Sequence, residues 1–145
     1  MLIEQSNGQW IVVMDRGQKL MSTLTEIAAE KNIKGGHIVG IGAVENVELG
    51  AYVLDTKEYI RKTFSESEYE LISLNGNITL KEESPFIHAH TAIGRHDFSM
   101  FGGHLFEAEI AVTAEFYITP FGIMPERQMN DLVGLATIQN CRINS

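Results

Sequence analysis

Cysteine and long apolar runs are scarce in this chain. Its 145 residues include one cysteine, Cys141, so no disulfide can form within the chain. A single cysteine suits a reducing compartment, and we expect a cytoplasmic protein. No apolar run approaches the ~20 residues of a membrane-spanning helix, and the first ten residues lack the basic and apolar regions of a secretory signal. We therefore expect no membrane association, and one domain over residues 1–145.

Positive charge is also scarce. Eleven Lys and Arg residues stand against nineteen Asp and Glu residues, which gives a formal net charge of -8. A protein that binds nucleic acid directly uses a cationic surface to displace counterions from phosphates. The densest basic stretch, KEYIRK from Lys57 to Lys62, is short and contains a glutamate. The charge therefore disfavours direct DNA binding.

One helix is recognisable, in the stretch STLTEIAAEKNIKGG. Thr23 and Glu26 have the spacing of a capping box, in which each side chain satisfies a free backbone donor of the first turn. Gly35 and Gly36 provide a signal for the end of the helix. The pattern predicts one amphipathic helix at about residues 23–34.

The remaining segments are rich in strand signals. Glu45-Asn46 predicts a turn, and Asn75-Gly76 predicts another, with a bulge in one long bent strand as the alternative. Residues 119–131 resemble an irregular connection before a last strand. The expected fold class is α+β, with one principal helix on a mainly antiparallel sheet or partial barrel.

One long stretch, LFEAEIAVTAEFYI, alternates cleanly between apolar and polar residues. Side chains two apart on a strand share a face, so the apolar set should point into the core. That expected inward set is Phe106, Ala108, Ile110, Val112, Ala114, Phe116 and Ile118.

Four of the five histidines lie between Phe86 and Ile110. His88 and His90 are two apart, so on a strand both rings project from the same face. Gly102-Gly103 permits a bend, and His104 then follows on the parity of the expected inward set. A hairpin would bring His104 near His88 and His90.

Three neutral imidazoles suit zinc or another borderline divalent ion, and three ligands leave one position open. An H-x-H pair on a strand often binds nothing, so the spacing alone leaves metal binding and an ordinary core both open. If such a metal activated water, Glu107 and Asp97 are the nearby candidates for a general base. The parity of Glu107 suits it better to steadying a ring N–H. His96 and His37 are expected to be solvent-facing and strand-start residues, not ligands.

The string HAHTAIGRHDFSMFGGHLFEAEIAVTAEFYI resembles the signature of the plant-and-prokaryote-conserved (PPC) domain. Three further stretches agree in order. RGQKLMSTLTEIAAEKNI is similar to the helix of that domain, IVGIGAVENVELGAY to its glycine-containing hairpin and YELISLNGNI to its central strand. The resemblance implies an α+β domain that assembles as a homotrimer. It also implies, for prokaryotic members, a metal usually assigned as zinc and held by the histidines matching His88, His90 and His104.

In plants the PPC domain accompanies AT-hook segments that bind DNA. This chain has no Arg-Gly-Arg-Pro hook, and the plant partner-binding stretch corresponds here to SEYELI (67–72), which lacks the arginine. The leading hypothesis is thus a homotrimeric metal-binding protein with a regulatory role, associated with DNA through a partner. The alternatives are a hydrolase-like enzyme that uses metal-activated water, and an oligomerisation module with a structural metal.

Overall fold

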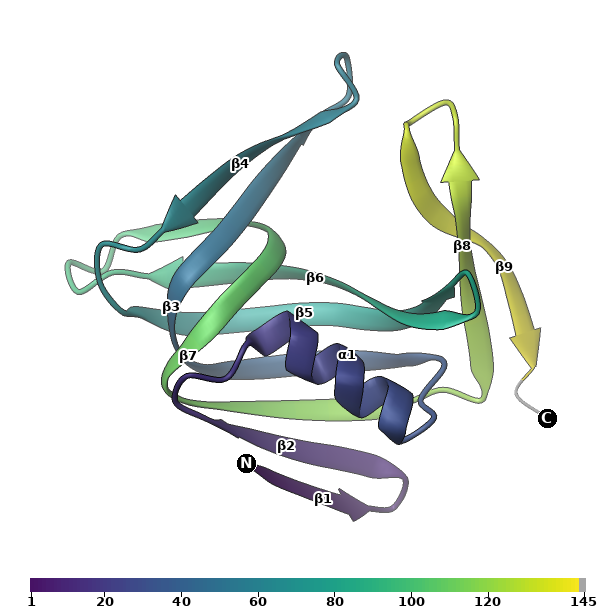
Figure 1. Ribbon diagram of the computed structural model, residues 1–145, viewed down its shortest axis with the longest axis horizontal. Helices are drawn as coiled ribbons and strands as arrows, with labels where there is room; N and C mark the ends of the chain where they lie inside the picture. Colours follow the sequence, from purple (N-terminus) through teal and green to yellow (C-terminus); the bar gives the residue numbers. More distant parts are fainter. Residues whose placement is uncertain (144–145) are drawn as a thin grey trace.

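The computed structural model describes residues 1–143 and shows one short helix against a large sheet (Figure 1). The last two residues of the domain expected at 1–145 lie outside the described part. The elements are β1 (Leu2–Ser6), β2 (Gln9–Asp15), α1 (Leu20–Glu30), β3 (Gly36–Val53), β4 (Glu58–Phe64), β5 (Tyr69–Lys81), β6 (Ser84–Gly94), β7 (Met100–Pro120), β8 (Ile123–Asn130) and β9 (Leu135–Ile143). The fold is therefore mostly β, and the α+β expectation gave the helix too much weight: α1 has only 11 residues.

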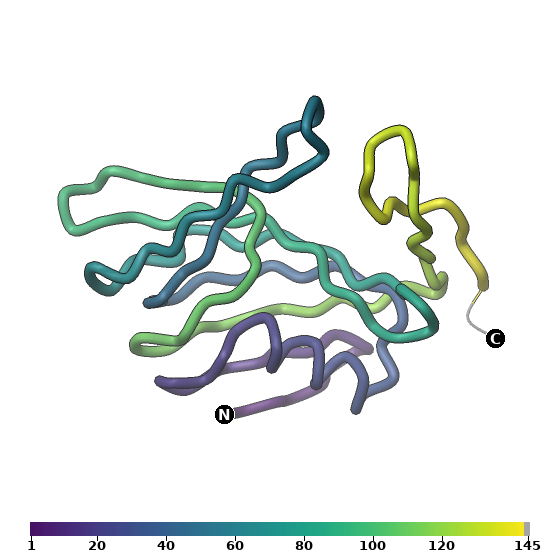
Figure 2. The backbone as a smooth tube through the Cα atoms, turned by 45° about the horizontal axis from the view of Figure 1, so that its top comes forward, coloured from purple at the N-terminus to yellow at the C-terminus, as the bar shows by residue number. Residues whose placement is uncertain are grey.

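The nine strands form one sheet in the order β1-β2-β7-β3-β5-β8-β9, with β4 paired to β3 and β6 paired to both β5 and β7. All of these pairings are antiparallel except β5 with β8, which is parallel. The mainly antiparallel sheet was expected. It curls into a partial ring and does not close as a barrel (Figure 2). None of the helices within residues 1–143 is long and apolar enough to cross a membrane.

Neither predicted turn is present. Glu45 and Asn46 lie inside β3, where the pairing with β7 shifts register between Glu45 and Glu48 and Asn46 takes a φ of 51°. The result is a bulge that bends one long strand. Asn75 and Gly76 lie inside β5 and pair regularly with β6, and the register shift in that pair falls earlier, between Leu71 and Ser73.

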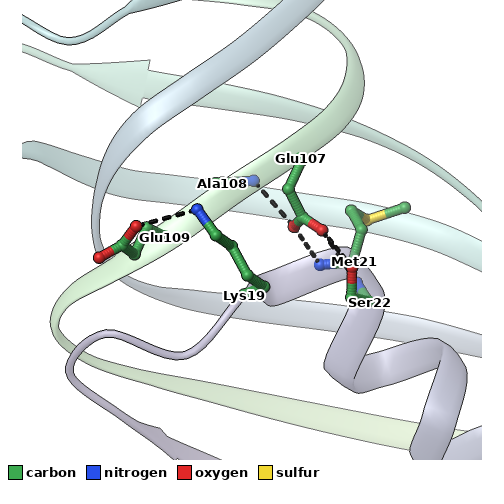
Figure 3. A network of polar contacts seen from close by, with 6 residues as sticks. All are labelled: Lys19, Met21, Ser22, Glu107, Ala108 and Glu109. Carbon is green, nitrogen blue, oxygen red and sulfur yellow. Dashed lines mark hydrogen bonds and ion pairs between the residues drawn. The ribbon is translucent and has the colours of Figure 1, made fainter.

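Helix α1 begins three residues before the expected start because a distant strand caps it. The N-cap residue Lys19 makes no side-chain cap, and Thr23 lies within the helix. The Glu107 carboxylate on β7 accepts hydrogen bonds from the Met21 amide at 2.7 Å, the Ser22 amide at 3.1 Å and the Ser22 hydroxyl at 2.6 Å (Figure 3). The predicted capping box does not form, because Glu107 satisfies those free donors.

The helix also ends earlier than expected. Asn32 adopts a left-handed φ of 53°, its amide donates to Ala29 O, and the Ile33 amide donates to Ala28 O at 2.8 Å. This pair of bonds is a Schellman motif, in which asparagine takes the position more often filled by glycine. Gly35 serves close packing instead, since a Cβ there would lie 2.1 Å from Ile123 O.

The apolar core lies between α1 and the sheet. From the helix, Leu20, Leu24 and Ile27 are buried, and the strands supply the facing side chains. Most of the expected inward set of β7 is buried, but Val112 is 63% exposed and Ala111 is buried. The pairing of β3 with β7 shifts register between Gly42 and Val44, opposite this segment, which explains the failed alternation.

Residues 119–131, expected to be irregular, instead contain β8, which pairs with β9. The β3–β4 and β8–β9 hairpins project on the same side of the molecule (Figure 2). Their tips are joined where Tyr52 Oη donates to Val133 O at 2.6 Å and Lys57 Nζ donates to Asp131 O at 2.5 Å. The two hairpins thus flank one face of the sheet.

Candidate metal centre

Three histidines converge where β6 pairs with β7. His90 lies directly opposite His104 in the antiparallel register, and His88 is two residues along β6. One ligand nitrogen from each ring can be chosen so that all three lie within 4.8 Å of one another. The ring centroids are 5.1 Å apart for His88 and His90, 5.1 Å for His88 and His104, and 5.6 Å for His90 and His104. The three histidines that the residue spacing singled out therefore lie together in the structure.

The face that these histidines occupy differs from the expected one. His104 was placed on the parity of Ala108 and Ile110, but Leu105 and Ala108 are both buried in the core. The pairing of β7 with β3 shifts between Leu105 and Glu109, which reverses the alternation there. His104 therefore points away from the core.

The same division holds on β6. Ile87 and Ala89 belong to the core beside α1, while His88 and His90 alternate with them and project from the opposite face. Both projecting hairpins contact the histidines: Tyr59 of β4 lies against His104, and Arg127 of β8 lies against His88.

Aromatic rings and an ion pair surround His104. Its ring centroid lies 5.0 Å from that of Tyr59 and 4.7 Å from that of Phe106. The Arg61 guanidinium lies 3.7 Å from the Phe106 ring centroid and makes two hydrogen bonds to Glu48, at 2.8 and 2.7 Å. The charge of Arg61 is therefore balanced by a carboxylate.

The electrostatics keep two of the imidazoles neutral near pH 7. Burial, followed by the positive charge of Arg127 and by the other two histidines, lowers the pKa of His88 to about 4. Burial, then His90, Arg127 and Arg61, lowers the pKa of His104. A neutral imidazole has the free lone pair that metal ligation requires.

One atom of the cluster lacks a partner. His104 Nδ1 is buried and makes no hydrogen bond within residues 1–143. A buried polar atom without a partner costs roughly 1–3 kcal/mol. Either a bound cation at this ring or an N–H partner would remove that cost. The donor set is three imidazoles, with His88 and His104 half-buried and His90 exposed, and it fits a borderline divalent ion such as zinc.

Arg127 is the residue of this site that the sequence did not reveal. It lies on β8 and places Nη2 3.3 Å from His88 Nδ1, across 39 residues of sequence. The parallel pairing of Lys81 with Arg127 brings β8 beside β5. The sequence held no signal for it, because this stretch looked irregular and parallel pairing has no local pattern.

The other candidate residues do not join the cluster. The Glu107 carboxylate caps α1, and Asp97 Oδ1 accepts hydrogen bonds from the Ser99 amide and hydroxyl in an exposed loop. His96 is exposed, 3.9 Å from Glu68. His37 Nε2 lies 3.0 Å from Asn75 Oδ1, at the edge of a hollow of about 400 Å³ that His88 and His90 also line.

The sequence profile of the Plants and Prokaryotes Conserved domain, abbreviated PCC or PPC, matches residues 1–122. The chain belongs to this family. Residues 123–145, which include Arg127 and both strands of the C-terminal hairpin, lie outside the match. A comparison with curated proteins gives no match.

Solved structures agree over almost the whole PPC chain. A metal-containing protein from Archaeoglobus fulgidus is 33% identical with a TM-score of 0.86, covering 97% of this chain and 99% of that one. A PPC protein from Pyrococcus horikoshii is 30% identical with a TM-score of 0.85, covering 98% and 97%. A protein of Bacteroides thetaiotaomicron, described as a "putative dna binding protein", is 30% identical with a TM-score of 0.91, covering 95% and 96%.

Proposed function

We propose that this PPC protein is a cytoplasmic homotrimer in which His88, His90 and His104 hold one divalent metal, zinc, in each subunit. The observation that carries the proposal is the cluster itself: three imidazoles whose ligand atoms lie within 4.8 Å of one another. The metal-containing relative from Archaeoglobus fulgidus supports it. When bound, zinc supplies a fixed positive charge with one open coordination position.

Elemental analysis of the purified protein tests the metal site. The wild type should contain about one zinc per chain, since three imidazoles form a sufficient protein ligand set. The double variant His88→Ala with His90→Ala should contain almost none. His37→Ala is the matched control, because His37 lines the same hollow but stands outside the cluster. Full metal occupancy in the double variant would overturn the assignment.

A second copy of the chain is the proposed cover for an exposed apolar face, defined here as Val39, Ile41, Ile72, Val112 and Tyr117. Ile41 is 57% exposed and Val112 is 63% exposed. The sheet places Val39 opposite Tyr117, and Ile41, Ile72 and Val112 line one hollow of the surface. Glu115, which pairs with Ile41, lies within this face, and exposed apolar side chains gathered in this way mark protein interfaces. The homotrimer implied by the family resemblance would bury it.

For DNA, we propose association through a partner protein and not by direct contact. One relative is described as DNA binding, but this chain has a net charge of -8. Direct binding would require enough cationic surface to release counterions from DNA. A titration of the purified protein with duplex DNA at low salt should therefore show no complex, and a complex that dissolves as salt rises would contradict the proposal.

The hydrolase hypothesis receives no support from the site. It needs a general base within hydrogen-bond reach of a metal-bound water. The two carboxylates considered for that role, Glu107 and Asp97, are bonded to the start of α1 and to Ser99. A binding or regulatory role is the function that the described contacts favour.

A further inference from the structure

Within residues 1–143, Arg127 is a partly buried cation without a carboxylate partner. Nε donates to Thr79 Oγ1 at 3.0 Å, Nη1 to Ala136 O at 3.0 Å, and Nη2 to Asn77 Oδ1 at 3.1 Å. All of these acceptors are neutral. The ion pairs found within residues 1–143 do not include Arg127. Its positive charge is held in place beside the histidines without being balanced.

Besides a cation–π contact with Phe86, at 5.4 Å from the ring centroid, Arg127 has one further polar contact, to a proposed metal ligand. Nη2 lies 3.3 Å from His88 Nδ1, and it can donate there only while Nδ1 carries a free lone pair. A neutral imidazole that ligates a metal through one nitrogen carries a hydrogen on the other. Whichever nitrogen of His88 binds the metal, Nδ1 then ceases to be an acceptor. Metal binding at His88 thus removes one acceptor from Arg127 and sets a second cation near it.

We propose that Arg127 and the open coordination position of the three-histidine site together bind a small oxyanion, a carboxylate or a phosphate group. The inference rests on the proposed metal site. One oxyanion can fill the open coordination position of the metal and can also accept the hydrogen bond from Arg127 that His88 no longer accepts. Arginine suits this role since its planar guanidinium donates in a fixed fork to carboxylates and phosphates.

The surroundings suit such a ligand. The adjacent hollow, about 400 Å³, is lined by His37, Asn75, Asn77 and Phe121 together with the two β6 histidines and two glycines, and none of these lining residues carries a carboxylate. Side-chain amides and an imidazole can donate to an anion. Arg127 does not line this hollow but adjoins it through its contacts with Asn77 and His88, so β8, which lies outside the family match, places a cation beside it.

Full-length protein loaded with Co²⁺ provides the test, because the visible spectrum of bound Co²⁺ reports a change in its ligands. Acetate and inorganic phosphate are titrated separately at pH 7, with ionic strength held constant by sodium perchlorate, so the two sources of oxyanion are compared. Arg127→Gln is the test variant. Arg61→Gln is the control, because Arg61 is near the same histidines but its charge is paired with Glu48.

We expect at least one of the two anions to change the wild-type spectrum and to bind Arg127→Gln roughly tenfold to a hundredfold more weakly, the loss of a charge-assisted hydrogen bond. Arg61→Gln should bind it like the wild type. The Co²⁺ affinity of Arg127→Gln without anion should be equal or higher, since a repelling cation is removed. Equal anion affinity in wild type and Arg127→Gln would overturn the inference.

A measurement on the wild type alone covers the case in which Arg127→Gln folds poorly. Binding linkage requires that an anion sharing the site tighten Co²⁺ binding by the same factor by which Co²⁺ tightens anion binding. Absence of any anion effect on the spectrum or on the Co²⁺ affinity would overturn the inference while leaving the metal site intact. Failure of the wild type to bind Co²⁺ would instead reject the metal site itself.

Discussion

Among single residues, Glu107 links the position of the helix to the strand that carries His104. Its carboxylate accepts three hydrogen bonds from Met21 and Ser22, while the neighbouring Lys19 Nζ lies 2.9 Å from Glu109 (Figure 3). A carboxylate at the start of a helix also interacts favourably with the helix dipole. Glu107 therefore caps the start of α1, where a local capping box had been expected.

Glu107→Ala should lower the free energy of unfolding by about 1–2 kcal/mol, the usual cost of losing a helix cap. Urea unfolding followed by circular dichroism measures this change. Glu26→Ala is the matched control, because Glu26 is an exposed glutamate of the same helix, outside the proposed trimer interface, and is expected to change stability little. Equal midpoints for the two variants would show that the Glu107 contacts do not stabilise the helix.

The histidines show how far residue spacing predicts a site. The two-residue spacing of His88 and His90 fixes their common face without any knowledge of the fold. A hairpin was expected to bring His104 close to these two histidines, and β6 and β7 form that hairpin in the structure. The face of the sheet from which His104 projects was predicted wrongly. Bulges beside Leu105 reverse the alternation of buried and exposed residues, and no residue type in the sequence indicates those bulges. Arg127 was missed because its contact depends on the position of a strand distant in sequence.

The sequence predicted the types of secondary structure well but their boundaries poorly. The pattern correctly placed one helix and a β-rich remainder, since these depend on apolar periodicity. Signals for turns failed at Asn46 and at Gly76. Asn46, with its left-handed φ, lies at a bulge within β3 instead of at a turn. A Cβ at Gly76 would lie 2.8 Å from His88 O, so that glycine allows β5 and β6 to approach closely.

The C-terminal hairpin was the element that local patterns described least. Strand β8 has a partly buried, partly exposed run that includes a proline, which argues against a central strand. Tertiary contacts stabilise it: Arg127 joins β8 to β5 and β9, and Tyr52 joins the β3–β4 hairpin to the loop before β9. These contacts are long-range, so they are invisible to a reading of neighbouring residues.

For the whole molecule, the exposed apolar face predicts the oligomeric state. Light scattering should give three times the chain mass for the wild type, and Ile41→Glu should dissociate it, because a buried unpaired carboxylate is strongly unfavourable. Leu132→Glu is the control, since Leu132 is 86% exposed and lies outside the apolar face. A monomeric wild type, or a trimeric Ile41→Glu protein, would contradict the proposed interface.

Removing the metal should leave that assembly intact. All three proposed ligands come from β6 and β7 of one chain, so the metal crosslinks two strands and not two subunits. The metal-free protein should therefore keep the trimer mass. Dissociation on chelation would favour the alternative in which the metal is structural for the oligomer.

The central claim is that His88, His90 and His104 hold one metal ion per subunit. Anomalous diffraction recorded on both sides of the zinc absorption edge, from crystals grown without added metal, tests it most directly. The account predicts one anomalous peak in each subunit, at the roughly 2.0–2.1 Å from three imidazole nitrogens that zinc requires. Zinc peaks located elsewhere, or zinc-soaked crystals with no peak among these three histidines, would contradict it.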